Sequence, residues 1–269
     1  MSDSSFYDSE EEEHKGCLDM FLQILFVLSP QYKFIERISG GVGCIVLRAQ
    51  TVAGDDVAVK IQSEDGVEEI DILKKLVHVP HCQTLVESYC FDNGASTIVS
   101  ELYRNDDILT HVKEDSEVTM IFIEQLVRAL HELHKRNIIH RDVKLSNICW
   151  DKSAKHLVLI DYDIATCEAR NVDPIGTDGY CAPEMFLVEH SNERDYQSTM
   201  TYDQKVDIYS AGVVLGQLLN DCAEVEVNDE LVLQWQHEEE EPDTMFLQMT
   251  KYDPVQRPTA QNLLAMYFY

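Results

Sequence analysis

The sequence predicts an α+β chain of two lobes, a small β-rich lobe with one helix followed by a larger, mainly helical lobe. Short β-branched and apolar stretches at 32–38, 45–50 and 57–61 are separated by turn residues, which is typical of strands. A single helical pattern follows them, and the rest of the chain carries longer amphipathic segments. This order places the two lobes at about residues 32–103 and 104–269.

Turn residues and apolar spacing define the individual elements. A glycine-rich turn lies between the first two strands, and residues 53–56 (AGDD) form the next turn. Two further strands flank residues 92–94 (DNG), because Asn-Gly favours a tight hairpin. Residues 68–77 (EEIDILKKLV) combine helical spacing with acids first and lysines last, as the helix dipole favours. Residues 118–133 carry one apolar face and predict a long helix.

The chain is strongly acidic and its cysteines are scattered. Lys and Arg total 21 against 49 Asp and Glu, a formal net charge of −28. Such a surface repels nucleic acid and anionic membranes and attracts basic protein segments. The eight cysteines form no zinc-ligand spacing, and no secretory signal is evident, so reduced thiols in the cytoplasm or nucleus are expected. The sequence gives no indication of oligomeric state.

The N-terminal region divides into two segments ahead of the main domain at 32–269. Residues 1–16 are rich in acids and predict a disordered tail. Residues 17–31 are predicted to be an apolar segment packed on the domain. Their apolar core, 17–28, is shorter than the roughly 20 residues of a membrane span and contains Asp19, so no membrane span is expected. An anchor for a membrane surface or a partner is the alternative.

Five sequence motifs occur in a fixed order along the chain: ISGGVGCIV at 38–46, VAVK at 57–60, HRDVKLSN at 140–147, DYD at 161–163 and GTDGYCAPE at 176–184. On these motifs the sequence resembles a eukaryotic-type serine/threonine protein kinase over roughly residues 32–266. The resemblance implies the two-lobed protein kinase fold and transfer of the γ-phosphate of ATP to serine and threonine hydroxyls of protein substrates. It also implies ATP and Mg²⁺ as ligands.

The motif at 140–147 supplies the residue types that phosphoryl transfer needs. The reaction requires an oriented nucleophile and neutralised phosphate oxygens. The carboxylate of Asp142 can accept the proton of the substrate hydroxyl as the catalytic base. Asn147 offers an amide oxygen to Mg²⁺, and Lys144 can reach the γ-phosphate. By resemblance, a lysine at this position is typical of serine/threonine rather than tyrosine kinases.

The third strand is predicted to provide the lysine that pairs with ATP. By resemblance, Lys60 holds the α- and β-phosphates and is itself braced by an acid on the following helix. Glu69 is the first candidate for that acid and Glu68 is the alternative. Glu69 follows Lys60 by only nine residues, so the helix has to begin almost at once and the small lobe is shortened.

The nucleotide site is completed by the glycine-rich turn and the hinge. Ser39 and Cys44 stand at two of the family's glycine positions, and glycines beside them can supply the same backbone freedom. By resemblance, two small apolar side chains sandwich the adenine, the hinge binds adenine through its backbone, and an acid beyond it contacts ribose or a basic substrate residue. The predicted nucleotide-binding residues are Ile38, Gly40, Gly41, Gly43, Val46, Ala58, Lys60, Glu101, Tyr103 and Asp107.

The motif at 161–163 resembles the metal-binding turn of the family. Asp161 is the predicted second ligand of Mg²⁺, because a hard cation favours carboxylate oxygen. Tyr162 takes the aromatic packing role. Asp163 replaces the family's glycine, which restricts the backbone and adds negative charge. Reduced activity and a turn locked in one state are both open consequences.

Three further contacts are expected from the resemblance. Thr177 should contact Asp142 and Lys144. Glu184 should pair with Arg257, in YDPVQRP at 252–258, and Asp207 should anchor the backbone of the catalytic loop from a buried helix.

Regulation and rival functions complete the prediction. Asp173 occupies the position of the usual activating phosphosite, and our hypothesis is that it gives Arg141 a permanent carboxylate partner. A pseudokinase that acts as a nucleotide-binding scaffold is the main alternative, favoured by Ser39, Cys44 and Asp163. A small-molecule phosphotransferase would lack the segment at 176–184.

The short small lobe also resembles herpesvirus-type serine/threonine kinases, which implies action in a host cell.

Overall fold

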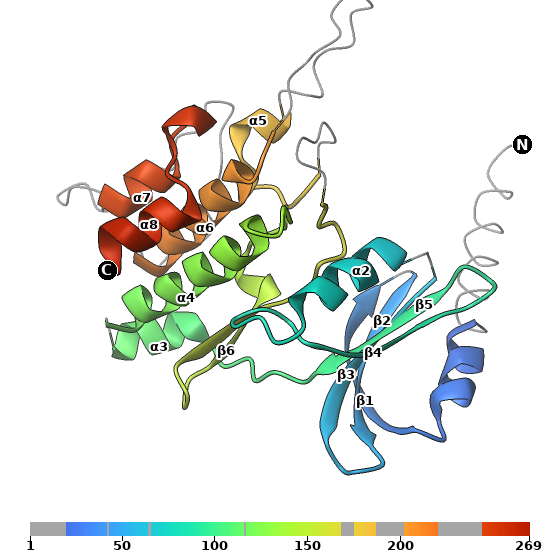
Figure 1. The fold of residues 1–269 in the computed structure, drawn as a ribbon. Coiled ribbons are helices and arrows are strands. Elements are labelled where there is room, and N and C mark those ends of the chain that lie inside the picture. The colour runs from blue at the N-terminus through green and yellow to red at the C-terminus, as the bar shows by residue number, and fades with distance from the viewer. Residues whose placement is uncertain are drawn as a thin grey trace, which may run out of the picture. The chain divides into compact units, whose positions relative to one another are not determined.

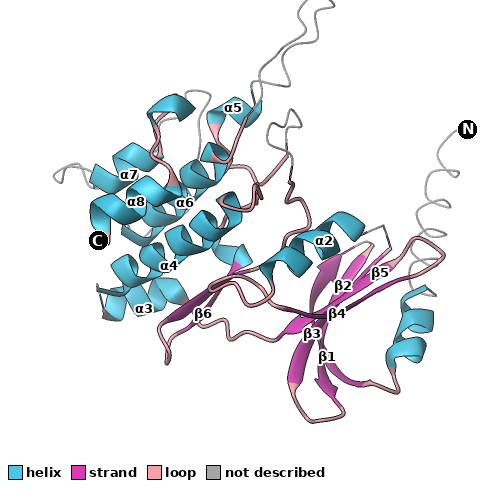
Figure 2. Ribbon diagram, in the orientation of Figure 1, coloured by secondary structure: helices cyan, strands magenta, loops and turns pink. Residues whose placement is uncertain are grey.

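A computed structural model describes residues 20–41, 43–63, 66–115, 117–167, 175–186, 202–219 and 244–269. These residues form two compact units, one within Met1–Val77 and Thr84–Leu102, the other within His78–Gln83 and Tyr103–Tyr269. Figures 1 and 2 show that the first unit contains a β-sheet with helices and that the second is mainly helical. The predicted α+β class is confirmed.

The first unit is built on one antiparallel sheet of five strands. The strand order is β1-β2-β3-β5-β4, so the two sequence-adjacent strands β4 and β5 form the outer hairpin (Figure 2). Each expected strand is present, including the pair around the Asn-Gly turn. The bounds are β1 (Tyr32–Gly41), β2 (Cys44–Thr51), β3 (Asp56–Gln62), β4 (Leu85–Cys90) and β5 (Ser96–Glu101).

A helix over residues 20–28 packs on one face of this sheet (Figure 1). Its buried residues Phe21, Ile24 and Leu28 recur at helical spacing, and they join the alternate residues of β2 and β3 that point to the same face. Those sheet residues are Leu47, Ala49, Val57, Val59 and Ile61. The predicted acidic tail at 1–16 lies outside the described residues. Within the described ranges, no helix has both the length and the apolar character needed to cross a bilayer.

The opposite face of the sheet carries the predicted site residues of β2 and β3. Val46 lies directly across from Lys60, and Ala58 is two residues before Lys60, so the three share that face. Helix α2 (Val67–Leu76) begins five residues after β3 ends at Gln62, as the short spacing requires. Its buried apolar residues Ile70, Ile72, Leu73 and Leu76 pack it into the unit.

The second unit consists of helices around α4 and a small hairpin. The long helix predicted at 118–133 is confirmed as α4, and α6 is buried along almost its whole length. The helices are α3 (Ile108–Glu114), α4 (Glu117–His134), α5 (Pro183–Phe186), α6 (Lys205–Leu219), α7 (Thr244–Met249) and α8 (Ala260–Tyr267). The hairpin is β6 (Ile148–Asp151) and β7 (His156–Leu159), and 3₁₀ turns lie at Leu145–Asn147 and Pro254–Gln256.

Residues 78–83 run beside β7 as part of the second unit. Cys82 forms a parallel bridge with Leu159. The amide of Leu159 donates to the carbonyl of His81 at 2.9 Å, and the amide of Gln83 donates back to the carbonyl of Leu159 at 3.0 Å. These bonds hold the segment against the strand that leads into the DYD motif.

Candidate active site

Lys60 and Glu69 form the predicted ion pair of the first unit. The Lys60 ammonium lies 3.0 Å from both carboxylate oxygens of Glu69, whose side chain is 2% exposed. The side-chain amide of Gln62 donates a further hydrogen bond to Glu69 at 2.8 Å. Glu68 is exposed, so Glu69 is the partner. Gly66 allows the tight turn into α2, since a Cβ there would lie 2.5 Å from Ser96 Oγ.

The glycine-rich turn obtains its backbone freedom from Gly40 and Gly43. Their φ values are 132° and 80°, a region that side chains rarely allow. A Cβ on Gly40 would also lie 2.5 Å from the carbonyl oxygen of Cys44. Gly41, by contrast, has no positive φ and no atom near a Cβ. The expectation that the neighbours of Ser39 and Cys44 supply this freedom is therefore confirmed.

The other predicted nucleotide-binding residues fall in both units. Ile38 is half exposed on β1, and Glu101 is exposed where β5 ends. Tyr103 and Asp107 belong to the second unit. Asp107 is the N-cap of α3, because its carboxylate accepts from the amide of Leu109 at 3.0 Å and from the hydroxyl of Thr110 at 2.6 Å. Its predicted contact with ribose or substrate stays a prediction.

The carboxylate of Asp142 is held by three side chains. Thr177 donates to Oδ1 at 2.6 Å, while the Lys144 ammonium and the Asn147 amide each lie 2.8 Å from Oδ2. Lys144 also donates to the Thr177 hydroxyl at 2.7 Å. The predicted contacts of Thr177 with Asp142 and Lys144 are confirmed. The four side chains therefore form one network in the second unit.

This network favours the ionised form of Asp142. Partial burial opposes ionisation, but the hydrogen bonds from Lys144 and Thr177 and the charge of Lys144 outweigh it and lower the pKa of Asp142 below its usual value. The carboxylate is thus ionised and oriented at neutral pH, which are the two requirements for a base.

Asp207 anchors the catalytic loop from the buried helix α6, as predicted. Its two oxygens accept the backbone amides of His140 at 3.0 Å and Arg141 at 2.9 Å. His134, at the end of α4, adds a contact of 2.9 Å. Complete burial opposes ionisation of Asp207, yet the bond from His134 and the nearby imidazoles lower its pKa. Arg141 has φ 68°, so these bonds hold an unfavourable backbone immediately before Asp142.

Asn147 and Asp161 lie on neighbouring segments. The amide of Ile160 donates to the carbonyl of Asn147 at 2.9 Å, which fixes the residue before Asp161 against the catalytic loop. The Asn147 side-chain nitrogen donates to the backbone carbonyl of Asp142 at 3.0 Å as well as to its carboxylate. Both hydrogens of this amide are thereby used, which leaves its oxygen for the predicted contact with Mg²⁺. An amide oxygen and a carboxylate fit Mg²⁺.

The turn at 161–163, predicted to bind metal, differs from the expectation at Asp163. The left-handed backbone occurs at Asp161, with φ 66°, and Asp163 is exposed and has no positive φ. The missing glycine therefore introduces no backbone strain at 163. Tyr162 is fully buried, with its ring centroid 4.9 Å from that of His140, so its aromatic packing role is confirmed.

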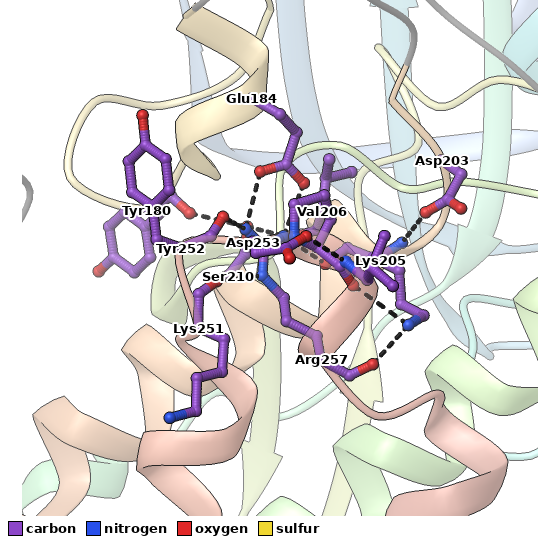
Figure 3. Close-up of polar contacts among 12 residues, drawn as sticks. Tyr180, Glu184, Asp203, Lys205, Val206, Ser210, Lys251, Tyr252, Asp253 and Arg257 are labelled. Atoms are coloured by element: carbon purple, nitrogen blue, oxygen red, sulfur yellow. Dashed lines mark hydrogen bonds and ion pairs between the residues drawn. The ribbon is translucent and has the colours of Figure 1, made fainter.

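Glu184 and Arg257 form the predicted buried pair. Their two hydrogen bonds measure 2.6 and 2.7 Å, and Figure 3 shows the two side chains facing each other. Arg257 also donates to backbone carbonyls at three positions, so all five of its N–H groups have acceptors. Those carbonyls belong to Lys251, Lys205 and Tyr252.

Sequence reasoning missed the contacts that Gln62, Gln83, His134 and Tyr202 make in the site. His134 had a signal, because a polar residue directly follows the amphipathic helix predicted at 118–133. The other three had none, since each is a single neutral residue in an ordinary strand or loop. The hypothesis that pairs Asp173 with Arg141 concerns a residue outside the described ranges.

The first unit thus contains a lysine braced by a buried carboxylate, and the second contains an oriented carboxylate at Asp142. The family model described as protein kinase domain matches residues 32–269, and the chain belongs to this family. The two-lobed α+β fold predicted from the motifs is that of the family.

The chain is also similar to individual protein kinases, some named as serine/threonine kinases and some as calcium-dependent or calcium/calmodulin-dependent kinases. Calcium-dependent protein kinase 4 of Plasmodium falciparum is 29% identical over 219 residues, which cover 73% of this chain and 38% of that protein. Calcium/calmodulin-dependent protein kinase cmkA of Emericella nidulans is 28% identical over 266 residues, 87% of this chain and 61% of that protein. Serine/threonine-protein kinase ULK3 of Xenopus laevis is 30% identical over 203 residues, 68% and 41% respectively. The chain spans less than two thirds of each of these relatives.

Proposed function

We propose that the chain is an active serine/threonine protein kinase that transfers the γ-phosphate of ATP to protein hydroxyls. The observation that carries the proposal is the network in which Thr177, Lys144 and Asn147 orient the ionised carboxylate of Asp142. Sequence similarity to proteins named as serine/threonine kinases supports the same function. The intact Lys60–Glu69 pair argues against a pseudokinase.

In the proposed reaction the oxygen of a substrate serine or threonine bonds to the γ-phosphorus of ATP. The bond between that phosphorus and the β–γ bridging oxygen breaks, and ADP leaves with the electron pair. Asp142 accepts the proton of the hydroxyl. Lys144 lies 2.8 Å from the same carboxylate and supplies positive charge where the transferred phosphate gains negative charge.

Asn147 and Asp161 are the proposed ligands of Mg²⁺, and Lys60 is the proposed partner of the α- and β-phosphates. When bound, Mg²⁺ neutralises charge on the phosphate oxygens. The residues proposed for the nucleotide remain those of the glycine-rich turn, β2, β3 and the hinge. Gly40 and Gly43 can bring backbone amides close to phosphate because neither carries a side chain.

The substrates are proposed to be proteins that present basic segments, since the chain carries a net charge of −28. The proposed place of action is the cytoplasm or nucleus, where ATP is present and free cysteines such as Cys90 stay reduced. The resemblance to herpesvirus-type kinases stays a prediction, and a host cell would be the place of action in that case.

The proposed activity includes independence from phosphorylation of the activation segment, with Asp173 as a permanent partner of Arg141. Asp173→Ala tests this part in enzyme freed of phosphate by a phosphatase. We expect a lower kcat in the variant and no loss of wild-type activity after phosphatase treatment. An unchanged kcat would remove Asp173 from the proposal and leave the kinase activity itself untouched.

The activity is tested by transfer of labelled phosphate from ATP to a basic and an acidic protein, followed by identification of the labelled amino acid. We expect phosphoserine and phosphothreonine, stronger labelling of the basic protein, and no labelling by Asp142→Asn. If wild type and variant both bind ATP and neither transfers labelled phosphate, the chain is a nucleotide-binding scaffold instead. Labelled tyrosine would overturn the assignment to serine and threonine.

A further inference from the structure

One peptide group in the metal-binding turn is held from both sides. The carbonyl of Ile160 lies 3.2 Å from Nε2 of His140, and the amide of Asp161 donates to Oε1 of Gln83 at 3.1 Å. These two atoms belong to the same peptide unit. The carbonyl is therefore tied to the catalytic loop, and the amide is tied to the segment that runs beside β7.

The clamped peptide is one that needs support. Asp161 has φ 66°, a conformation that asparagine and aspartate adopt more readily than other residues but that remains uncommon. A buried amide without an acceptor is also unfavourable, and the side chain of Gln83 supplies that acceptor. Rotation of this peptide would change the direction of the Asp161 carboxylate and would break both hydrogen bonds.

Gln83 is itself rigidly placed. It is 9% exposed, and its own amide donates to the carbonyl of Leu159 at 3.0 Å. The same carbonyl accepts the hydroxyl of Tyr162 at 3.3 Å, so Gln83 and Tyr162 are both held by the carbonyl of Leu159. A polar side chain at this buried position is explained by the acceptor that it provides.

We propose that Gln83 is a positioning residue that locks the Ile160–Asp161 peptide in the orientation required of a metal ligand at Asp161. The proposal rests on the proposed function for the role of Asp161 and on geometry alone for the lock. It gives the metal-binding turn a single state maintained by an amide from outside the DYD motif. An outer-shell residue of this kind changes metal affinity or activity by about 10- to 100-fold when removed.

The test compares variants that keep or lose the acceptor oxygen. Gln83→Met removes it at similar volume, and Gln83→Glu retains it. Gln125→Met is the matched control. The side chain of Gln125, on α4, accepts through Oε1 the backbone amide of Leu157 in β7 at 2.8 Å, and this bond lies outside the turn at 161–163. The first readout is the hydrogen-exchange rate of the Asp161 backbone amide, measured by NMR in protein free of metal and nucleotide.

We expect faster exchange of the Asp161 amide in Gln83→Met and protection close to wild type in Gln83→Glu and Gln125→Met. The Mg²⁺ concentration for half-maximal phosphate transfer should rise about tenfold or more in Gln83→Met alone. Unchanged exchange in Gln83→Met, or the same change in Gln125→Met, would overturn the proposal. Altered exchange in a protein that transfers no phosphate would refute the proposed function and leave the lock intact.

A measurement on the wild type covers the case in which Gln83→Met does not fold. The amide of Asp161 should exchange more slowly than that of Asp163, which lies at an exposed position of the same turn. Equal exchange of the two amides would show that the peptide is not locked.

Discussion

The hydroxyl of Tyr202 lies 3.2 Å from Nη1 of Arg141, the residue immediately before the proposed base. Tyr202 is 2% exposed and precedes α6, which also carries the anchor Asp207. Arg141 donates through Nε to the carbonyl of Ile164 at 2.5 Å. Its side chain therefore joins the catalytic loop to two other segments, and the hydroxyl of Tyr202 is one of its fixed points.

Tyr202→Phe removes this hydroxyl and keeps the buried ring. A hydrogen bond to a charged group contributes about 1.5–3 kcal/mol, so we expect kcat/KM to fall about tenfold or more while the protein stays folded. The measurement is steady-state phosphate transfer, and Tyr252→Phe is the control because Tyr252 is 61% exposed. Equal rates for the two variants would contradict a positioning role for Tyr202.

Glu69→Gln should reduce activity much more than Glu68→Gln. The first change removes the carboxylate that holds Lys60 at 3.0 Å, whereas Glu68 is exposed on the same helix. Removal of one preorganised hydrogen-bond donor from an oxyanion hole costs about 10²–10³ in kcat, and we expect a loss of similar order when the carboxylate that positions Lys60 is neutralised. Parallel kinetics of both variants provide the check. Similar rates would mean that the Lys60 ammonium is placed without Glu69.

The helix at 20–28 should contribute to the stability of the first unit through its buried face. Ile24→Ala leaves a cavity in the core cluster that includes the sheet residues Val57 and Val59, and it should lower the free energy of unfolding by about 2–5 kcal/mol. Leu22→Ala, at a position that is 56% exposed, should change it by about 0.5 kcal/mol or less. Urea unfolding of both variants distinguishes a packed helix from a loosely attached one, for which the two values would be alike.

The pKa of Asp142 predicts a specific dependence of stability on pH. Folding lowers this pKa, so the ionised carboxylate stabilises the folded chain above its unfolded pKa of about 3.9. This contribution is lost as the pH falls through the lower pKa of the folded state. We expect wild type to lose stability relative to Asp142→Asn as the pH is lowered from 5 to about 3. Urea midpoints that stay parallel over this range would contradict the prediction.

Contacts between motif residues could be predicted from the sequence, whereas contacts made by isolated residues could not. The pairing of Glu184 with Arg257 was predictable because both stand in recognisable motifs, although 73 residues separate them. The bond between Gln83 and Asp161 spans 78 residues and joins a neutral side chain to a backbone amide. No residue pattern encodes such a bond, because a backbone amide is present at almost every position.

The residue that carries the backbone strain of this turn could not be identified from the sequence. The substitution of glycine by Asp163 suggested restriction at that residue, yet the positive φ lies at Asp161. The conformation of a turn depends on which peptide groups find partners, and here His140 and Gln83 decide it. Residue identity alone therefore indicated the turn but not the residue that carries its strain.

Arg257→Lys provides a test of geometry against charge at the Glu184 pair. Lysine retains the positive charge but offers three donors to replace five, and it cannot form the two parallel bonds to Glu184. Arg257 is fully buried, and its guanidinium lies 4.9 Å from the ring centroid of Tyr209, so lost contacts cannot be replaced by water.

We expect Arg257→Lys to lower the free energy of unfolding by about 2–6 kcal/mol, because three donors replace five and two acceptors are left unsatisfied at about 1–3 kcal/mol each. Glu184→Gln tests the charge separately, because it leaves the buried guanidinium without its carboxylate, a change that costs about 3–5 kcal/mol, while the three backbone carbonyls still accept from Arg257. The surface change Lys135→Arg, in an exposed pair with Glu132, is the control and should change stability by about 0.5 kcal/mol or less. If Arg257→Lys unfolds at the same urea concentration as this control, charge rather than the five-donor geometry of Arg257 holds the segment.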